Sequence, residues 1–146
     1  MKDLKKLAQS ILDQGYLMSL GTLDDGGVWV SDVIYVHDDN FNIYWMSDPE
    51  VRHSEAILKN NKVAATITIS NTLGEKNVGL QIEGRAEKIE GNDFGIATLY
   101  YTKRKKPIPN ENDDILQGDS WYRLTPTKIE IIYEPEFGFE KKKLEL

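Results

Sequence analysis

The first segment of the chain has the apolar spacing of an amphipathic helix. Apolar side chains recur at positions i, i+3, i+4, i+7 and i+8, namely Leu4, Leu7, Ala8, Ile11 and Leu12. This spacing places them on one helical face. Asp3 can cap the helix and Gly15 can end it. The pattern therefore predicts a helix between these two residues.

The rest of the chain is dominated by patterns typical of β-strands. We expect strands over 16–23, 28–37, 41–46, 63–69, 78–89 and 120–133. The first two flank Asp24-Asp25-Gly26-Gly27, a strong hairpin-turn signal. In the second strand, the apolar set Val28, Val30, Ile34 and Val36 is interpreted as the core face, which Asp32 interrupts.

Two further helices are expected between the strands. Pro49 suits a first helical position, so a short helix is predicted after the third strand, capped by Ser47 or Asp48 and ending near Lys59. Another begins at Asp93 and cannot continue through Pro107. Six strands joined mostly by hairpins must close or pack to hide their edges. The 146 residues suit one domain, 1–146, of the mainly β class.

Composition narrows the classes of partner. The net charge of −6 argues against a nucleic-acid or anionic-membrane footprint. The basic run over 103–106 is followed by an acidic one, so a solvated helix end is the favoured interpretation over a binding patch. No cysteine is present, and the chain has neither a signal-peptide pattern nor an apolar run long enough to cross a bilayer. We expect a cytoplasmic protein without disulfides or thiolate metal sites.

Common catalytic motifs are missing from the sequence. It has two histidines, His37 and His53, which do not form a metal-ligand spacing, and it has no P-loop, nucleophile elbow or GxGxxG motif. The sequence offers little for a hydrolase, and no catalytic residue or metal ligand is assigned.

The strongest chemical signal is an anion site in MSDPEVRHSEAI, residues 46–57. Ser47 ends a strand, and the following helix start offers free N–H groups and a positive dipole end. Arg52 adds a planar fork suited to phosphate, and His53 can donate a further hydrogen bond. The alternative is ordinary capping, with Arg52 paired to a nearby carboxylate.

Two other features can be functional or structural. Asp32 lies mid-strand beside Ser31, where a ligand can approach a barrel, but a bulge or a wet barrel mouth also explains it. Trp121, beside Tyr122 and Arg123, can flank a planar ligand or pack in a core or a dimer interface.

The order and spacing of several segments resemble the FMN-binding split β-barrel superfamily, typified by pyridoxamine 5′-phosphate oxidase. The resemblance covers nearly the whole chain and is closest to a branch of small bacterial proteins. It is carried by GTLDDGGVWVSDVIYVHDD, NIYWMSDPEVRHSEAI, NKVAATITI, LQIEGRAEKIEG and SWYRLTPTKIEII. It implies a six-stranded split β-barrel with peripheral helices, and a homodimer with FMN at the subunit interface.

The resemblance also implies roles for individual residues. Ser47 and Arg52 match the positions that hold the FMN phosphate, and His53 follows as in the smaller branch. The flavin ring is expected against Ser31, Asp32 and Val33. The resemblance implies a further ring contact from Gln81, and Trp121 is added as the ring-flanking candidate that its own position beside Arg123 suggests.

Departures from the oxidase limit the expected activity. The arginine that begins the oxidase's second strand is absent near Trp29, and its C-terminal substrate-binding segment is not recognisable. Oxidation of pyridoxamine phosphate is therefore not expected. The resemblance implies a flavin-dependent oxidoreductase of unknown small-molecule substrate; the alternative is a non-catalytic module of the same fold that binds deazaflavin, haem or nothing.

Overall fold

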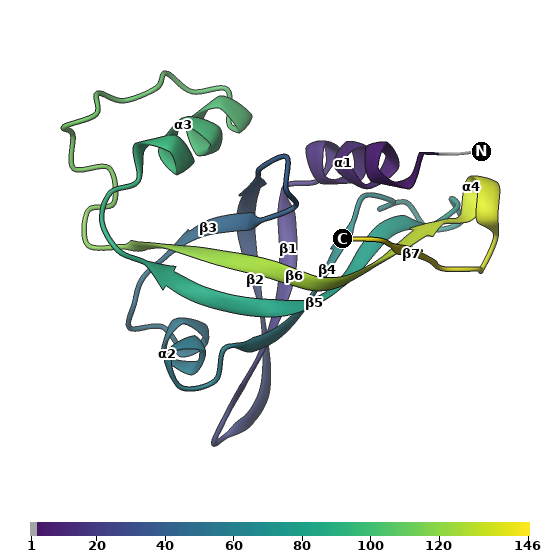
Figure 1. Ribbon diagram of the computed structural model, residues 1–146, viewed down its shortest axis with the longest axis horizontal. Coiled ribbons are helices and arrows are strands. Elements are labelled where there is room, and N and C mark those ends of the chain that lie inside the picture. Colours follow the sequence, from purple (N-terminus) through teal and green to yellow (C-terminus); the bar gives the residue numbers. More distant parts are fainter. Residues whose placement is uncertain (1–2) are drawn as a thin grey trace.

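A computed structural model describes residues 3–146 as a mainly β protein in which helices cover both ends of a barrel (Figure 1). The elements in chain order are α1 (Leu4–Gln14), β1 (Leu17–Asp24), β2 (Gly27–His37), β3 (Ile43–Ser47), α2 (Arg52–Lys59), β4 (Lys62–Thr68), β5 (Val78–Ile89), α3 (Phe94–Lys103), β6 (Ser120–Tyr133), α4 (Glu134–Phe137) and β7 (Lys142–Leu144). Within this part of the chain, no helix is long and apolar enough to span a membrane.

The barrel is closed by β6, the longest strand. The antiparallel strand order is β3-β2-β1-β4-β5-β6-β7, and β3 also pairs with β6. The first part of β6, Ser120–Leu124, pairs with β3, and its later part, Ile129–Ile131, pairs with β7. Six strands therefore form the barrel and β7 is an outer addition, which confirms the predicted fold class. The sequence analysis missed α4 and β7.

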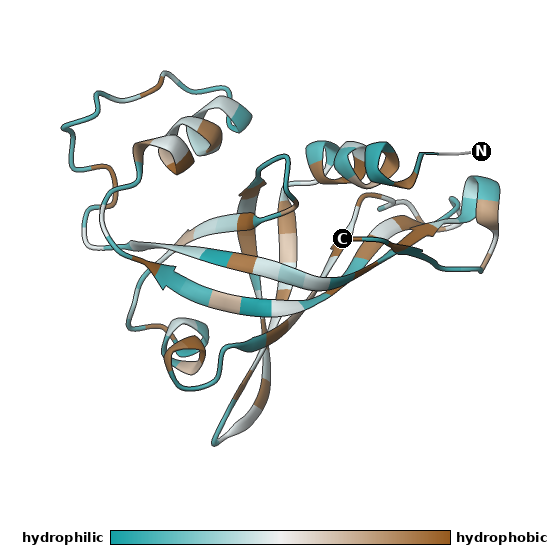
Figure 2. Ribbon diagram, viewed as in Figure 1, coloured by the Kyte–Doolittle hydropathy of each residue, from teal (hydrophilic) through white to brown (hydrophobic). Residues whose placement is uncertain are grey.

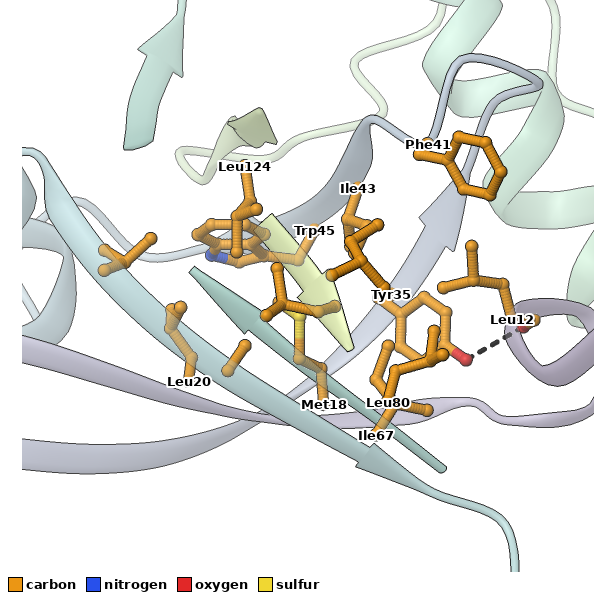
Figure 3. Close-up of a cluster of buried hydrophobic side chains, with 14 of the residues drawn as sticks. Leu12, Met18, Leu20, Tyr35, Phe41, Ile43, Trp45, Ile67, Leu80 and Leu124 are labelled. Carbon is orange, nitrogen blue, oxygen red and sulfur yellow. Dashed lines mark hydrogen bonds between the residues drawn. The ribbon is translucent and has the colours of Figure 1, made fainter. Parts of the chain in front are cut away.

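The barrel interior holds the main hydrophobic core. Alternate residues of the strands contribute buried side chains to this core, and brown apolar segments recur along the strands (Figure 2). Trp45 and Tyr122, both fully buried, stack within it, with ring centroids 5.8 Å apart. At one end, the Tyr35 hydroxyl donates to the Leu12 carbonyl oxygen at 2.8 Å and so fastens α1 to the barrel (Figure 3). A second, smaller core lies between α3 and the outside of β2, β3 and β6.

The two faces of β2 are the reverse of the sequence interpretation. Val33 and Tyr35 point into the barrel, whereas Val28 and Val30 lie on its outer face, with 76% and 61% of their surface exposed. Val36 shares that outer face but is buried because α3 covers it. The predicted core face was therefore wrong along the hairpin half of β2. Val28 and Val30 form a regular apolar row in the sequence, whereas the inward positions near the hairpin carry Trp29 and the polar Ser31. The alternation therefore favoured the wrong face.

Candidate functional site

The residues of the anion site that the sequence predicted lie at the junction between β3 and α2. Ser47 is the last residue of β3, and Val51 is the N-cap of α2, whose first residue is Arg52. The predicted cap by Ser47 or Asp48 and the helical Pro49 were wrong. The Asp48 carboxylate instead accepts a hydrogen bond from the Glu50 N–H at 2.8 Å, and this closes a turn before the helix. Because no side chain caps α2, its first N–H groups keep their donor capacity.

Ser47 and His53 meet across this junction. The Ser47 Oγ and His53 Nε2 atoms are 3.0 Å apart, and His53 is half-buried. Burial lowers the pKa of His53, so the imidazole is neutral at neutral pH. The pair therefore presents a hydroxyl and an uncharged imidazole beside the helix start. This contact joins two of the predicted site residues.

Arg52, the third predicted member, has a different partner. Its Nε and one terminal nitrogen donate to the two carboxylate oxygens of Asp24 at 2.9 and 3.0 Å. Its guanidinium carbon also lies 4.5 Å from the centroid of the Trp29 ring. The hydrogen bonds from Arg52 lower the pKa of Asp24, and Asp24 raises the pKa of Arg52. Pairing of Arg52 with a nearby carboxylate was the alternative to an anion site in the sequence analysis. In the structure Arg52 is paired in this way with Asp24, a side chain of the β1–β2 hairpin.

A hollow of about 540 Å³ separates this hairpin from one face of α2. Four carboxylates line it, those of Asp24, Asp25, Glu50 and Glu55. Arg52 and Lys59 are the cations of its lining. The electrostatic environment around the Arg52 fork is therefore acidic, which opposes the binding of a phosphate dianion.

Gln81 and Asp32 lie on the outer face of the barrel. They are on different strands but belong to one row of residues paired across the strands. The row is set by register: Asp32 is paired with Ser19, Ser19 with Thr66, Thr66 with Gln81, and Gln81 with Glu130. Paired residues share a face of a sheet. The Ser19 hydroxyl donates to Asp32 Oδ1 at 2.7 Å. Asp32 is exposed there and does not interrupt a core.

This polar row crosses a shallow hollow of about 460 Å³. Gly21 and Ala64 keep the sheet surface low in the hollow, while the exposed Val28 and Val30 flank it. Glycine and alanine let a flat group approach the backbone. The arrangement can accept a planar ligand or a second protein surface, with hydrogen-bonding side chains along one line.

The other predicted ring contacts are less accessible. Val33 belongs to the barrel core, and Ser31, on the same strand, is half-buried. Trp121 is fully buried against α3, where its ring meets the edge of Tyr100 at a centroid distance of 5.4 Å. Trp121 is therefore a core residue, which was one of the alternatives given for it in the sequence analysis.

Sequence reasoning missed three residues of the site. Asp24 was interpreted only as a turn residue, Trp29 was given no role, and Ser19 was not singled out. The register of the β1–β2 hairpin, which pairs Asp24 with Gly27 and Ser19 with Asp32, could have indicated the last of these. Across residues 3–146, no three histidine, aspartate or glutamate side chains gather in a way that would hold a metal ion.

Comparisons with known proteins agree with this architecture. The sequence profile of the family described as pyridoxamine 5′-phosphate oxidase matches residues 4–133. A UPF0306 protein of Yersinia pestis bv. Antiqua (strain Angola) is 26% identical over 99 residues, which are 67% of each chain.

Two solved structures share the fold at low sequence identity. A haem-binding protein from Mycobacterium smegmatis has a TM-score of 0.75 and 14% identity; the match covers 99% of this chain and 58% of that one. An FAD-binding protein from Mesorhizobium loti has a TM-score of 0.67 and 16% identity, covering 88% and 90%. The fold is thus found in proteins that bind different planar cofactors.

Proposed function

Because the chain belongs to the pyridoxamine 5′-phosphate oxidase family, we propose that it is an FMN-binding flavoprotein with an oxidoreductase role. The observation that carries the proposal is the β3–α2 junction, where Ser47 and His53 meet at 3.0 Å beside Arg52 at an uncapped helix start. Hydroxyl, imidazole, guanidinium and free N–H groups are the donors that a phosphate monoester needs. Bound FMN would supply hydride or electron transfer, and the protein would supply binding and orientation.

The β3–α2 junction offers hydrogen-bond donors that suit the FMN phosphate, but the charge around Arg52 is unfavourable for it. When His53 Nε2–H donates to Ser47 Oγ, the Ser47 hydroxyl remains free to donate to a phosphate oxygen, as do the first N–H groups of α2. Arg52, however, is engaged by Asp24, and the hollow beside it is acidic. The phosphate is therefore expected to be held chiefly through the Ser47 side of the junction unless Asp24 releases Arg52.

We place the flavin ring on the outer face of the barrel. Both hollows border the β1–β2 hairpin, because one is lined by Asp24 and Gly26 and the other by Gly21 and Val28. The row containing Asp32 and Gln81 would face the polar edge of the ring. A second copy of the chain would cover the exposed valines, so that the protein acts as a homodimer with the cofactor at the subunit interface.

The test is to examine the purified protein for a flavin absorption band and to titrate the stripped protein with FMN. Arg52→Gln should weaken FMN binding by about tenfold if the phosphate displaces Asp24, because the charge-assisted bond that Arg52 then makes to the phosphate is lost. Lys59→Gln is the matched control, since Lys59 lines the same hollow without joining the Arg52 fork. A colourless protein that binds no FMN at micromolar concentration would contradict the proposal.

A haem-binding module is the second candidate, favoured by the half-buried, neutral imidazole of His53. Neutral imidazole is the form that ligates iron. His37 is a weaker axial candidate because its imidazole is only 10% exposed and lies 3.1 Å from Asp13. A Soret band on haem addition that is lost in His53→Ala would favour this candidate; a deazaflavin would be distinguished by its own absorption band.

A further inference from the structure

We infer that Asp24 is an internal competitor for the phosphate group: its carboxylate fills the Arg52 fork, so ligand affinity depends on whether Asp24 yields. This inference rests on the proposed function and concerns how the same site is regulated. It makes Asp24 of the β1–β2 hairpin a determinant of ligand affinity and of the preference for a phosphorylated ligand.

The first support is the geometry of the ion pair. Arg52 donates to both oxygens of Asp24 at 2.9 and 3.0 Å, in a fork-to-fork arrangement. An arginine fork uses the same two donors for a carboxylate and for a phosphate. Asp24 and a phosphate group therefore cannot both hold these donors, so they compete directly.

The second support is that Asp24 is held by its own turn. The Gly26 N–H donates to Asp24 Oδ1 at 2.9 Å, so the carboxylate is oriented before it meets Arg52. Because Arg52 keeps the pKa of Asp24 below its usual range, the competitor stays ionised at neutral pH. A modest change of pH therefore does not release Arg52.

The third support is that Arg52 has a separate anchor. Trp29 lies against the guanidinium with its ring centroid 4.5 Å from Cζ. A ring contact of this kind holds the cation without using its N–H donors. Removal of the Asp24 charge should therefore free the fork while Arg52 stays in place.

The fourth support is that the pair can exchange. The side chains of Arg52 and Asp24 are 38% and 21% exposed, so solvent reaches both. Water screens ion pairs in such positions, which lowers the free energy needed to separate them. A phosphate dianion that gains further hydrogen bonds from Ser47 and the start of α2 can displace Asp24. The affinity is lowered by the free energy needed to separate Asp24 from Arg52.

The test compares FMN with riboflavin, which lacks the phosphate, on four proteins: the wild type, Asp24→Asn, Asp25→Asn and Arg52→Gln. The first substitution keeps the shape of the side chain and its turn but removes the charge that holds the fork. We expect Asp24→Asn to lower the Kd for FMN about tenfold or more while the Kd for riboflavin stays unchanged. Asp25→Asn removes the same charge one residue away, from a side chain that does not bond Arg52, and should change the Kd for FMN by less than about threefold.

The outcomes separate the competitor from the proposed function. Unchanged or weaker FMN binding in Asp24→Asn would overturn the inference, since Asp24 would then position Arg52 for the ligand. If neither flavin binds any of the proteins, the flavin function fails. Inorganic phosphate then decides the inference through the NMR signal of Arg52 Nε–H. A shift in Asp24→Asn that the wild type lacks at equal phosphate concentration supports competition, and no shift in either overturns it.

Discussion

Lys103 stands apart from the other residues of its basic run. Its amine donates to the Leu12 carbonyl oxygen at 2.9 Å and lies 4.1 Å from the centroid of the Tyr35 ring. The expectation of a fully solvated run over 103–106 is therefore wrong for this residue, because the last turn of α3 packs toward α1. Burial lowers the pKa of Lys103 to about 8.

This pKa predicts a pH-dependent contribution to stability. Between about 8 and the ordinary lysine value of 10.5, the unfolded chain binds the Lys103 proton and the folded chain does not. Stability contributed by this group therefore rises as pH increases through that window. We expect the advantage of the wild type over Lys103→Met, measured by urea unfolding, to grow from pH 8 to pH 10.

The matched control is Lys105→Met, which removes an exposed lysine two residues away. Because this substitution is at an exposed position, it should change the free energy of unfolding by no more than about 0.5 kcal/mol. Parallel pH profiles for the wild type and Lys103→Met would contradict the assignment, and the amine would then be solvated in the folded protein.

Individual site residues were predictable where they are close in sequence. Ser47 and His53 are six residues apart, so a strand followed by a helix brings them together, and the sequence indicates this. Arg52 and Asp24 are 28 residues apart. Their contact depends on how the β1–β2 hairpin lies against α2, which local patterns do not specify. The sequence could name Arg52 but not its partner.

At the scale of elements, prediction succeeded where apolar and polar residues alternate over a long segment. The bounds of β5 and β6 agree with the expected ranges 78–89 and 120–133, because each strand packs one face on the core. β7 was missed because three residues within a lysine-rich run carry no usable period. α2 begins later than predicted because a side chain of the preceding turn competes with the helix.

The pairing of β5 with β6 contains one irregularity that offers a sharp test. The register shifts between Glu83 and Gly84, where Gly84 faces Pro126 and the next pair is Glu83 with Lys128. A Cβ on Gly84 would collide with the Thr125 carbonyl oxygen and lie 3.0 Å from Pro126 Cα. These are backbone atoms and cannot move aside cheaply.

Gly84→Ala should therefore lower the free energy of unfolding by about 1–3 kcal/mol, the usual cost of overpacking. Urea unfolding measures this directly. Arg85→Ala, at the exposed neighbouring position, is the control and should stay within about 0.5 kcal/mol of the wild type. An equally small effect of Gly84→Ala would mean that the bulge is not closely packed.

At the scale of the whole molecule, the exposed valines on the outer face of the barrel are the surface that a second protein would cover. Val28 and Val30 are 76% and 61% exposed beside the polar row. Our proposed homodimer buries them. Val30→Glu should place a charge in that interface and give a monomer, together with weaker FMN binding.

Sedimentation velocity measures the change in mass. Leu73→Glu, at a fully exposed loop position, is the control and should leave the mass unchanged. A wild-type protein that sediments as a monomer with flavin bound, or a Val30→Glu variant that stays a dimer, would show that this face is not the interface.

The closure of the barrel by β6 also has a consequence for how the chain folds. β3 receives its second partner from Ser120–Leu124, more than 70 residues later in the sequence, and β5 pairs with the same late strand. Such long-range pairing slows folding, because a large loop must close before the contacts form. During synthesis on the ribosome, β3 and β5 must wait with open edges until β6 has emerged. Newly made chains are therefore expected to depend on protection from aggregation during that interval.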